Sequence, residues 1–386
     1  MTAGMTDRRT NAIFIVHSNM PPPSPPPMRM SLAVSAALTL LCARPVAALQ
    51  IGPLLSTCID SCRLGCREIR SVQQARDDGS STMAVSFKDS DDATSALTEA
   101  DTRAQAAIVG ALRSEWGEEL RIIGEEDDNA DVASLLEGRT FDPLDRTLFD
   151  DELGETADLD AADFTIYVDP LDATREFVDG RLENCQVLVG IAIGDQAVAG
   201  VIGIPFPAGD LSTGETIVYG MADVGTGVVG EPLARGPFPL ERNIDGIKFP
   251  RPHVASGRSQ SPVMKSARDA VNRFGGSNVQ YGGAGNKILA AALGEVSASI
   301  QDRYGGPWDV CAPEAIIKGF GGKITDLFGQ DIAIYGPNAP RRCSERGYVA
   351  TPPSSDVPHD ALIATLLSQS DVKQHREDLI GEDTGN

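Results

Sequence analysis

The stretch Val168-Asp169-Pro170-Leu171-Asp172-Ala173-Thr174-Arg175-Glu176-Phe177 decides how the rest of the chain is interpreted. The apolar, β-branched run over residues 164–168 predicts a short buried strand that ends at Pro170, and residues 175–178 can start a helix. Asp169 and Asp172 therefore stand at a strand-to-helix turn, with the Leu171 carbonyl between them. Oxygen ligands of this kind suit a hard divalent cation such as Mg²⁺. The amides of Ala173 and Thr174, at the predicted helix start, offer a site for a phosphate.

A second copy of the same letters shows that context matters. Residues 141–147 read Phe-Asp-Pro-Leu-Asp-Arg-Thr, but no apolar strand precedes them and the surrounding residues are crowded with Asp and Glu. An aspartate before a helix more often caps that helix than binds a metal, so one such residue alone indicates only a cap. We interpret residues 141–147 as a surface segment within a solvated acidic insertion over residues 127–163. Weak calcium binding by that insertion is the alternative.

The acidic composition limits the classes of partner. The 386 residues include 33 Lys and Arg against 55 Asp and Glu, which gives a formal net charge of −22. This charge argues against sequence-independent nucleic-acid binding, which depends on neutralising phosphates with Lys and Arg. An acidic protein that handles an anionic substrate needs bound cations to offset its own field. The composition is therefore consistent with a metal site.

Cysteine and histidine residues indicate little further chemistry. The seven cysteines include no CxxC pair, and none of the four histidines adjoins the central motif. Cys58, Cys62 and Cys66 recur every four residues and therefore share one helix face. We expect them to be buried as small apolar side chains, with a redox role as the alternative. A histidine nucleophile or general base is not expected.

Residues 1–50 are interpreted as a leader. After a proline-rich tract, the basic start Met28-Arg29-Met30, the apolar run over residues 31–43 and the small residues 47–48 match a signal peptide. The run is shorter than the roughly 20 residues that a membrane span needs, so no stable span is expected. An N-terminal anchor and an organelle transit segment are the alternatives. We expect entry into the secretory pathway or a plastid, or a cytoplasmic location if the leader is not used.

Residues 51–370 are predicted to form one domain of alternating helices and strands. Helices are expected over residues 54–71, 97–116, 261–274, 286–293 and 311–319, and strands over residues 120–123, 215–219, 226–230, 296–300 and 323–327. Residues 185–193 and 197–204 read as two strands joined by a tight Gly194-Asp195 turn, a hairpin. This alternation indicates a layered α/β or α+β architecture. The polar residues 371–386 are predicted to be a disordered tail.

Three further acids are candidates to join Asp169 and Asp172. Glu125 follows a predicted strand, Asp309 follows Trp308 before a helix, and Asp101 lies near the start of another helix. Each alone is more simply a cap or a solvated acid. Together they would form a carboxylate cage for two or three metal ions, and two such ions can activate water and clamp a phosphoryl group.

Three signatures in this sequence can now be read together. They are Gly124-Glu125-Glu126 after a strand, Asp169 to Thr174, and Trp308-Asp309 followed by Ala312-Pro313-Glu314 and Gly321-Gly322. In this order and spacing they resemble the inositol monophosphatase superfamily, from about Pro53 to past residue 350. The resemblance implies an α+β fold, the layered αβαβα sandwich of the inositol monophosphatase and fructose-1,6-bisphosphatase type.

Within that superfamily the chain looks most similar to the 3′(2′),5′-bisphosphate nucleotidases. The similarity rests on Leu97 to Asp101, Ile122 to Asp127, and Tyr281-Gly282-Gly283-Ala284-Gly285-Asn286-Lys287. It implies hydrolysis of the 3′-phosphate of 3′-phosphoadenosine 5′-phosphate, a nucleotide of sulfur metabolism, to AMP and phosphate. Inhibition by Li⁺ is implied as well. The partner is then a small phosphorylated nucleotide or inositol phosphate.

The same resemblance implies a role for each motif residue. Two or three Mg²⁺ ions would be held by Glu125, Asp169, Asp172, Asp309 and the Leu171 carbonyl. Asp101 and Thr174 would orient and deprotonate the attacking water. Substrate contacts would come from Ala173, Thr174, Gly283 and Lys287. The cationic side chains of Lys287 and Arg258 are the candidates to neutralise a second phosphate.

Two departures from the family pattern concern the substrate side. Ala173 stands where the family often has Gly, so its φ must be compatible with a side chain. Gly257 and Gln260 replace a Thr and a His within a stretch where many members read Thr-Arg-Ser-His-Ser. Alternatives therefore stay open: an inositol polyphosphate 1-phosphatase or inositol monophosphatase, or a non-catalytic acidic protein that binds cations or nucleotides. The intact Asp101 and Thr174 pair counts against the last.

Overall fold

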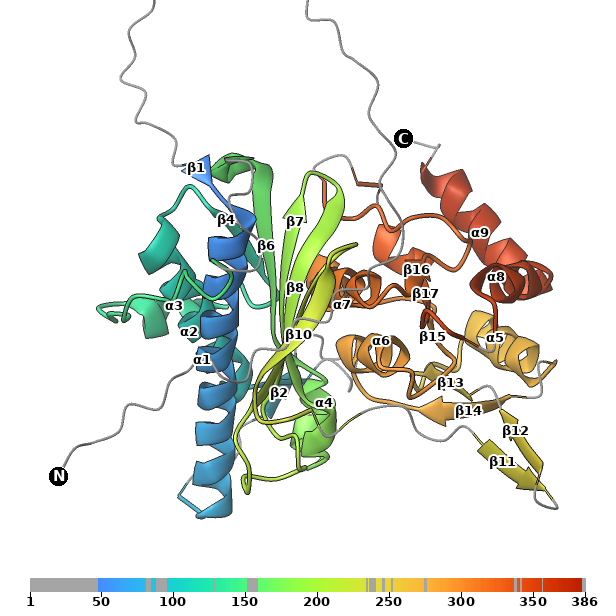
Figure 1. Cartoon of the computed structure of the whole chain (residues 1–386), viewed down its shortest axis with the longest axis horizontal. Helices are drawn as coiled ribbons and strands as arrows, with labels where there is room; N and C mark the ends of the chain where they lie inside the picture. Colours follow the sequence, from blue (N-terminus) through green and yellow to red (C-terminus); the bar gives the residue numbers. More distant parts are fainter. Residues whose placement is uncertain are drawn as a thin grey trace, which may run out of the picture.

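A computed structural model of the chain shows alternating layers of helices and sheets (Figure 1). It describes residues 48–80, 85–87, 96–127, 129–150, 159–233, 235, 241–244, 247–250, 253–273, 276–336, 339–340, 342–355 and 357–383. From one side to the other the layers are a helix pair, a six-stranded sheet, a second helix pair, a five-stranded sheet and an outer group of helices. This arrangement confirms the predicted layered αβαβα sandwich.

The six-stranded sheet has the strand order β10-β9-β8-β7-β6-β4. Its strands are β4 (Arg121–Gly124), β6 (Phe164–Asp172), β7 (Gln186–Ile193), β8 (Gln196–Ile204), β9 (Thr216–Met221) and β10 (Gly225–Gly230). All neighbours are antiparallel except β4 and β6, which run in parallel. Helices α1 (Ile51–Asp77) and α2 (Glu99–Trp116) cover one face, and α7 (Pro307–Gly319) packs on the other with α6 (Ala284–Ala292) beside it. The predicted hairpin over residues 185–204 is confirmed as β7 and β8.

The five-stranded sheet has the order β14-β13-β15-β17-β16. Its strands are β13 (His253–Ser256), β14 (Ser277–Gln280), β15 (Ala298–Gln301), β16 (Lys323–Thr325) and β17 (Tyr348–Thr351). Its outer face carries α5 (Pro262–Arg273), α8 (His359–Leu367) and α9 (Ser370–Asp383). The peripheral helices are α3 (Ala130–Leu136) and α4 (Thr174–Val178), and the 3₁₀ turns are η1 (Ala161–Asp163), η2 (Leu182–Asn184) and η3 (Cys343–Arg346). Three short strand pairs complete the periphery: β1 (Ala48–Leu49) with β5 (Leu159–Asp160), β2 (Val85–Phe87) with β3 (Ala96–Thr98), and β11 (Glu241–Ile244) with β12 (Ile247–Pro250).

The core between α1 and the first sheet contains the three cysteines on one helix face, as predicted. Cys58, Cys62 and Cys66 are fully buried there as free thiols. Burial raises the pKa of the Cys58 thiol far above its ordinary value, which keeps it protonated and unreactive. These cysteines therefore act as small apolar side chains.

Helix α7 approaches the other face of the sheet closely because glycines lie beneath it. Gly190, Gly200 and Gly220 are register partners across β7, β8 and β9. A Cβ atom at Gly200 would lie 2.4 Å from the carbonyl oxygen of Ala312, and one at Gly190 would lie 2.6 Å from the Cys311 sulfur. This row of glycines lets the helix backbone rest almost directly on the strands.

Three predictions about local structure are wrong. Pro170 does not end β6, which continues to Asp172 through a shift in its register with β7. Residues 371–386 were expected to be disordered, but α9 reaches Asp383 and buries Val372 and Leu379 against the outer helices. The acidic insertion is not simply solvated, because Val132, Leu144 and Phe149 are buried.

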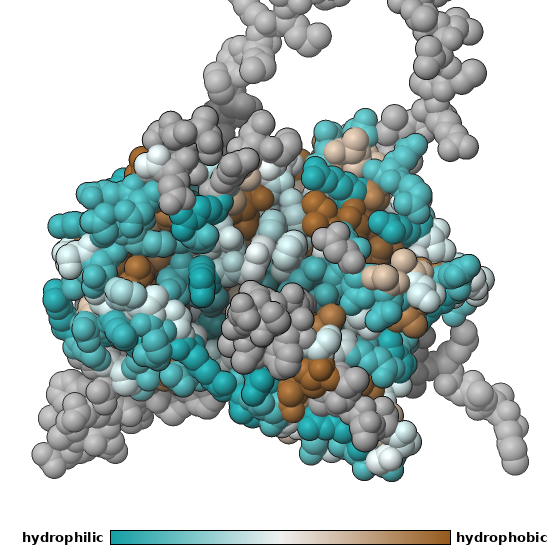
Figure 2. Space-filling model, turned by 180° about the vertical axis from the view of Figure 1, so that it is seen from behind, coloured by the Kyte–Doolittle hydropathy of each residue, from teal (hydrophilic) through white to brown (hydrophobic). Residues whose placement is uncertain are grey.

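The surface is consistent with the acidic composition. The face in Figure 2 is mostly hydrophilic, with small apolar patches scattered over it. Large hydrophobic side chains that are exposed in the described part of the chain include Leu135, Val224 and Ile380. Among the described residues, no helix combines the length and the apolar character of a bilayer span. The signal-peptide prediction falls on residues before 48 and lies outside the described residues.

Candidate active site

The ends of β4 and β6 bring Glu125 and the central motif together. The two strands are parallel, with Gly124 paired to Val168, so the next residues, Glu125 and Asp169, lie side by side at the same edge of the sheet. The backbone amide of Glu125 donates to the Val168 carbonyl at 3.0 Å, which fixes its position. Side chains that follow parallel strands meet in this way at the carboxyl edge of a sheet. The predicted neighbourhood of Glu125 and Asp169 is therefore present.

The turn between β6 and α4 has an unusual backbone conformation. Ala173 has φ 71° and ψ 40°, the left-handed region that normally favours glycine. The requirement for a φ that suits a side chain is thus not met, and Ala173 is strained. Its conformation turns the chain from the strand directly into α4, which starts at Thr174. Because α4 has only five residues, it supplies little of the helix dipole expected for phosphate binding.

Asp101 and Thr174 form the predicted pair. The Thr174 hydroxyl lies 2.8 Å from Asp101 Oδ1 and 3.0 Å from the Leu171 carbonyl oxygen. The other carboxylate oxygen, Oδ2, accepts hydrogen bonds from the backbone amide and hydroxyl of Thr98, which makes Asp101 part of a capping box on α2. The capping role and the pairing with Thr174 therefore coexist in one carboxylate.

The environment of Asp101 favours proton exchange near neutral pH. Its side chain is buried, and burial raises the pKa of Asp101 to about 7 against the lowering effect of its hydrogen bonds with Thr98 and Thr174. The negative charge of Glu126 raises this pKa further. A carboxylate with such a pKa can accept and release a proton at the pH where most enzymes work.

Asp172 is bound to the start of α6. Its carboxylate oxygens accept hydrogen bonds from the backbone amides of Ala284 at 2.9 Å and Asn286 at 3.3 Å. A Cβ atom at Gly283 would lie 2.4 Å from Asp172 Oδ2, and Gly283 has φ 75°, so only glycine fits at this position. The motif in the first sheet is thereby joined to the glycine-rich turn over residues 282–285.

Asp309 and Lys287 complete the charged group. Burial, followed by the negative charges of Glu125 and Asp172, raises the pKa of Asp309 to about 7. Burial likewise lowers the pKa of Lys287 to about 8, although the charges of Asp172 and Asp309 act in the opposite direction. The charges of Glu125 and Asp172 thus act on Asp309, and those of Asp172 and Asp309 act on Lys287, as expected for side chains that are near one another.

The residues present suit divalent cations in their chemistry, although their carboxylates are not gathered around a common point. Across the residues that the structure describes, no group of three or more His, Cys, Asp or Glu side chains is arranged to hold a metal ion. Asp169 instead accepts from the Leu171 amide at 3.0 Å, and Asp309 accepts from the Gly305 amide at 2.5 Å. Buried carboxylates that disfavour one another's charge are nevertheless the oxygen donors that Mg²⁺ prefers. The site therefore fits magnesium by donor type and by charge.

A cavity of about 900 Å³ lies beside this group. Three of the predicted substrate-side residues line it, Arg258, Gly283 and Lys287, together with Gly257 and Gln260, whereas Ala173 and Thr174 are not among its lining residues. Further lining residues come from α4, from residues 301–303 and from α9, which contributes His375. The cavity thus lies between α4, the start of α6, the end of β15 and the outer helices α5 and α9.

The two cations expected to meet a second phosphate are already occupied. The Arg258 guanidinium donates to Glu176 Oε1 at 3.0 Å, and the Lys287 ammonium group bonds to the Gly283 carbonyl oxygen. Glu176, which sequence reasoning missed, also accepts from Arg181 at 2.5 Å and 2.9 Å and from Asn184 at 3.0 Å. No sequence signal marks Glu176 as a hub, because its partners lie up to 82 residues away.

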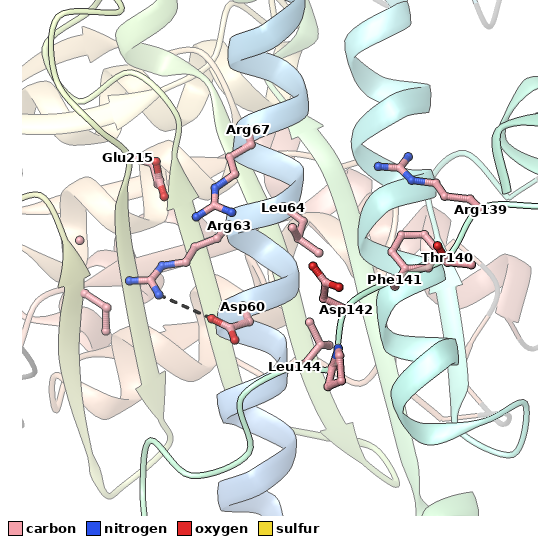
Figure 3. Close-up of a pocket in the computed structure, with 13 residues that line it drawn as sticks. Asp60, Arg63, Leu64, Arg67, Arg139, Thr140, Phe141, Asp142, Leu144 and Glu215 are labelled. Carbon is pink, nitrogen blue, oxygen red and sulfur yellow. Dashed lines mark ion pairs between the residues drawn. The ribbon is translucent and has the colours of Figure 1, made fainter. Parts of the chain in front are cut away.

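The second copy of the motif lines a different cavity (Figure 3). This cavity, of about 690 Å³, lies against α1: Asp60, Arg63 and Arg67 extend from the helix on the side of Glu215, and Phe141 and Asp142 lie on its other side. Arg63 pairs with Asp60 at 3.5 Å, and Arg139 lies over the Phe141 ring. No strand precedes residues 141–147, and none of the predicted site residues lines this cavity. The interpretation of residues 141–147 as separate from the active site is consistent with this placement.

Comparisons with known proteins agree with this geometry. The chain is 35% identical over 245 residues to human 3′(2′),5′-bisphosphate nucleotidase 1, covering 61% of this chain and 73% of that protein. It is 31% identical over 235 residues to the bovine Golgi-resident adenosine 3′,5′-bisphosphate 3′-phosphatase (58% and 56% covered) and 27% identical over 333 residues to zebrafish inositol monophosphatase 3 (83% and 86% covered).

A solved structure and a family model complete the comparison. The extragenic suppressor protein suhB from Bartonella henselae superposes with a TM-score of 0.55 at 15% identity, covering 81% of this chain and 98% of that one, which shows a shared fold. Residues 65–371 match the model of the inositol monophosphatase family. Magnesium-dependent hydrolysis of phosphate monoesters is the chemistry of that family. The chain therefore belongs to the inositol monophosphatase family of phosphomonoesterases.

Proposed function

We propose that the protein is a Mg²⁺-dependent 3′(2′),5′-bisphosphate nucleotidase that hydrolyses the 3′-phosphate of 3′-phosphoadenosine 5′-phosphate to AMP and phosphate. The observation that carries this proposal is the contact of 2.8 Å between the buried Asp101 carboxylate and the partly buried Thr174 hydroxyl, beside the carboxylates of the central motif. A protein that only bound its ligand would not need such a pair. The similarity to human 3′(2′),5′-bisphosphate nucleotidase 1 supports the choice of substrate.

The chain's own residues account for the proton transfer. The Thr174 hydroxyl donates to Asp101, so its lone pairs are available to accept a proton from a water molecule. As that water attacks phosphorus, its proton passes to Thr174 while the hydroxyl proton of Thr174 passes to Asp101. The bond from phosphorus to the 3′-oxygen breaks, and that oxygen takes up a proton from solvent. No covalent intermediate is required.

Magnesium would be held by Glu125, Asp169, Asp172, Asp309 and the Leu171 carbonyl. When bound, Mg²⁺ supplies positive charge that lowers the pKa of water and offsets the charge on the phosphoryl oxygens. Lys287 already offsets part of the carboxylate charge, because it lies near Asp172 and Asp309. Competition of Li⁺ for these ligands is expected to inhibit the enzyme.

The test is phosphate release by the purified protein from 3′-phosphoadenosine 5′-phosphate, with and without Mg²⁺. We expect Mg²⁺-dependent turnover in the wild type and its loss in Asp169→Asn and Asp172→Asn, with unchanged circular dichroism. Asp142→Asn, at the matching place in the second copy of the motif, is expected to leave the rate unchanged, because Asp142 is exposed on another cavity. Turnover that survives in Asp172→Asn would contradict the ligand assignment.

An inositol phosphate phosphatase is the second candidate. It is favoured by the similarity to zebrafish inositol monophosphatase 3 and by Gly257 and Gln260, which line the cavity where many nucleotidases carry other residues. A comparison of kcat/KM for inositol 1,4-bisphosphate and for the nucleotide decides between the two. Ligand-induced stabilisation without turnover of either compound would instead indicate a non-catalytic binding protein.

We further propose that residues 1–50 direct the protein into the secretory pathway or a plastid. The bovine relative is named as Golgi-resident, which supports the secretory route. Residues 1–50 fused to a fluorescent protein are expected to move it out of the cytosol, and starts at Met28 and Met30 can be compared in the same experiment. A cytosolic fusion protein would refute a targeting role for the leader.

A further inference from the structure

Arg303 is a cation in the cavity next to the active site, and it lacks an ion pair within the part of the chain that the structure describes. Four cationic side chains line this cavity: Arg175, Arg258, Lys287 and Arg303. Arg175 pairs with Asp179 at 3.1 Å and Arg258 pairs with Glu176 at 3.0 Å, while Lys287 is buried against the Gly283 carbonyl. Arg303 is exposed and forms no ion pair with any residue in the described ranges. Its guanidinium is therefore available to a ligand.

Two acids that line the same cavity as Arg303, Asp302 and Glu345, are engaged with other residues. The carboxylate of the neighbouring Asp302 accepts from the hydroxyls of Ser259 at 3.0 Å and Ser261 at 2.5 Å. The carboxylate of Glu345 accepts from Arg342 Nε at 2.7 Å. This hydrogen bond is the main reason that the pKa of Glu345 is lowered, and the charge of Arg303 is a smaller one. Arg303 acts on Glu345 through its charge but forms no ion pair with it.

The backbone under Arg303 is fixed although its side chain is exposed. The Arg303 carbonyl accepts from Gln301 Nε2 at 2.6 Å. The next residue, Tyr304, is buried, and its amide donates to the Ser344 carbonyl at 3.2 Å. An arginine on a fixed backbone loses less conformational freedom on binding than one on a mobile loop.

The wall near Arg303 belongs partly to a segment beyond the family match. The family model ends at residue 371, whereas His375 on α9 lines the same cavity. The His375 ring donates from Nε2 to the Glu345 carbonyl at 2.7 Å, which joins α9 to the segment that carries Glu345. Val372 and Leu379 bury the other side of α9. This end of the cavity is therefore built by the chain's own C-terminal helix.

We propose that Arg303 binds the second, non-scissile phosphate of a bisphosphate substrate and so determines the preference for bisphosphates over monophosphates. This inference rests on the proposed function, because it concerns the substrate of the same site. A guanidinium can donate two parallel hydrogen bonds to a phosphate, which makes it a better partner than an ammonium group. In a chain of net charge −22, a free arginine offsets the repulsion that a second phosphate would meet.

The experiment compares substrates that differ by one phosphate. Steady-state kinetics are measured with adenosine 3′,5′-bisphosphate and adenosine 3′-monophosphate, and with inositol 1,4-bisphosphate and inositol 1-phosphate. We expect Arg303→Gln to lower kcat/KM for the bisphosphate by about 10- to 100-fold through KM, because that is the effect of one charge-assisted hydrogen bond. The monophosphate of the same pair is expected to change less than about twofold. Arg303→Lys should restore part of the loss.

Arg273→Gln is the matched control, since Arg273 is exposed on α5 outside the cavity and its loss should change neither substrate. Equal loss on both substrates, or no loss on the bisphosphate, would overturn the proposal for Arg303. If the wild type hydrolyses neither pair, the proposed function fails, and calorimetric binding of the two adenosine nucleotides then tests Arg303 separately. Equal affinities in wild type and Arg303→Gln, or no binding, would overturn the inference as well.

Discussion

The strained turn at Ala173 makes a sharp prediction: Ala173→Gly should stabilise the protein. Ala173 has φ 71° in the middle of the motif, where its carbonyl oxygen accepts from the amides of Glu176 at 2.8 Å and Phe177 at 3.2 Å. These bonds, and those from the α6 amides to the neighbouring Asp172, hold the backbone in the left-handed region. Glycine adopts this conformation without a Cβ clash.

The size of the effect follows from two opposing terms. A residue with a Cβ pays roughly 1–2 kcal/mol in the left-handed region, which glycine would recover. Glycine at the same time gives the unfolded chain more freedom, which costs roughly 0.4–1 kcal/mol. The Ala173 methyl group is only partly buried, so little packing is lost. The net gain is about 1 kcal/mol, or about 2 °C in Tm for a domain of this size.

Urea-induced unfolding followed by circular dichroism measures this change, with a constant slope expected in both proteins. Ala364→Gly is the matched control, because Ala364 is exposed within α8 and has an ordinary helical backbone. That substitution should destabilise by about 1 kcal/mol. If Ala173→Gly lowers the unfolding midpoint as Ala364→Gly does, the positive φ at Ala173 and the argument from it are wrong.

Three further outcomes follow from the structure. Gly200→Ala should destabilise by about 1–3 kcal/mol in chemical denaturation, because its Cβ would lie 2.4 Å from a backbone oxygen of α7, whereas Gly257→Ala, which meets nothing within 4 Å, should be neutral. Burial lowers the pKa of His359 to about 4, below its unfolded value near 6.5. The free energy of unfolding is therefore unaffected by this histidine above pH 6.5 and decreases as the pH falls from 6.5 toward 4, because the unfolded chain binds the proton first. Between pH 7.5 and 5 wild type should lose about 2 kcal/mol more than His359→Gln; parallel pH profiles would contradict this. Asp101→Asn should lower kcat, measured by phosphate release, by at least about 100-fold with unchanged circular dichroism. A smaller decrease would show that Asp101 does not take part in the proton transfer.

The sequence predicted the elements that depend on local patterns. The β7–β8 hairpin follows from two apolar runs and a Gly-Asp turn. The three cysteines on α1 followed from their spacing of four. Each of these features is encoded within a short stretch of chain.

Features that depend on distant partners could not be predicted in this way. Strand β6 passes Pro170 because the missing amide falls where the register with β7 shifts, so no ladder hydrogen bond is lost there. Helix α9 is polar along most of its length, and only its contact with the outer helices makes it ordered. The ion pair of Arg258 with Glu176 could not be predicted for a similar reason, since the two residues are 82 positions apart in the sequence.

The layered architecture also determines what an activity measurement reports. Asp101, Glu125, Asp169 and Asp172 are carried by the first sheet and its helices, whereas Lys287, Arg258 and Arg303 are carried by the elements around the second. Two backbone amides at the start of α6 donate hydrogen bonds to Asp172, and this contact between the two halves lies within the candidate site. Turnover should therefore disappear as soon as the two halves slide apart, while each half still retains its own sheet. Loss of activity during heating should therefore report the separation of the two halves at this contact, and it should precede the loss of secondary structure.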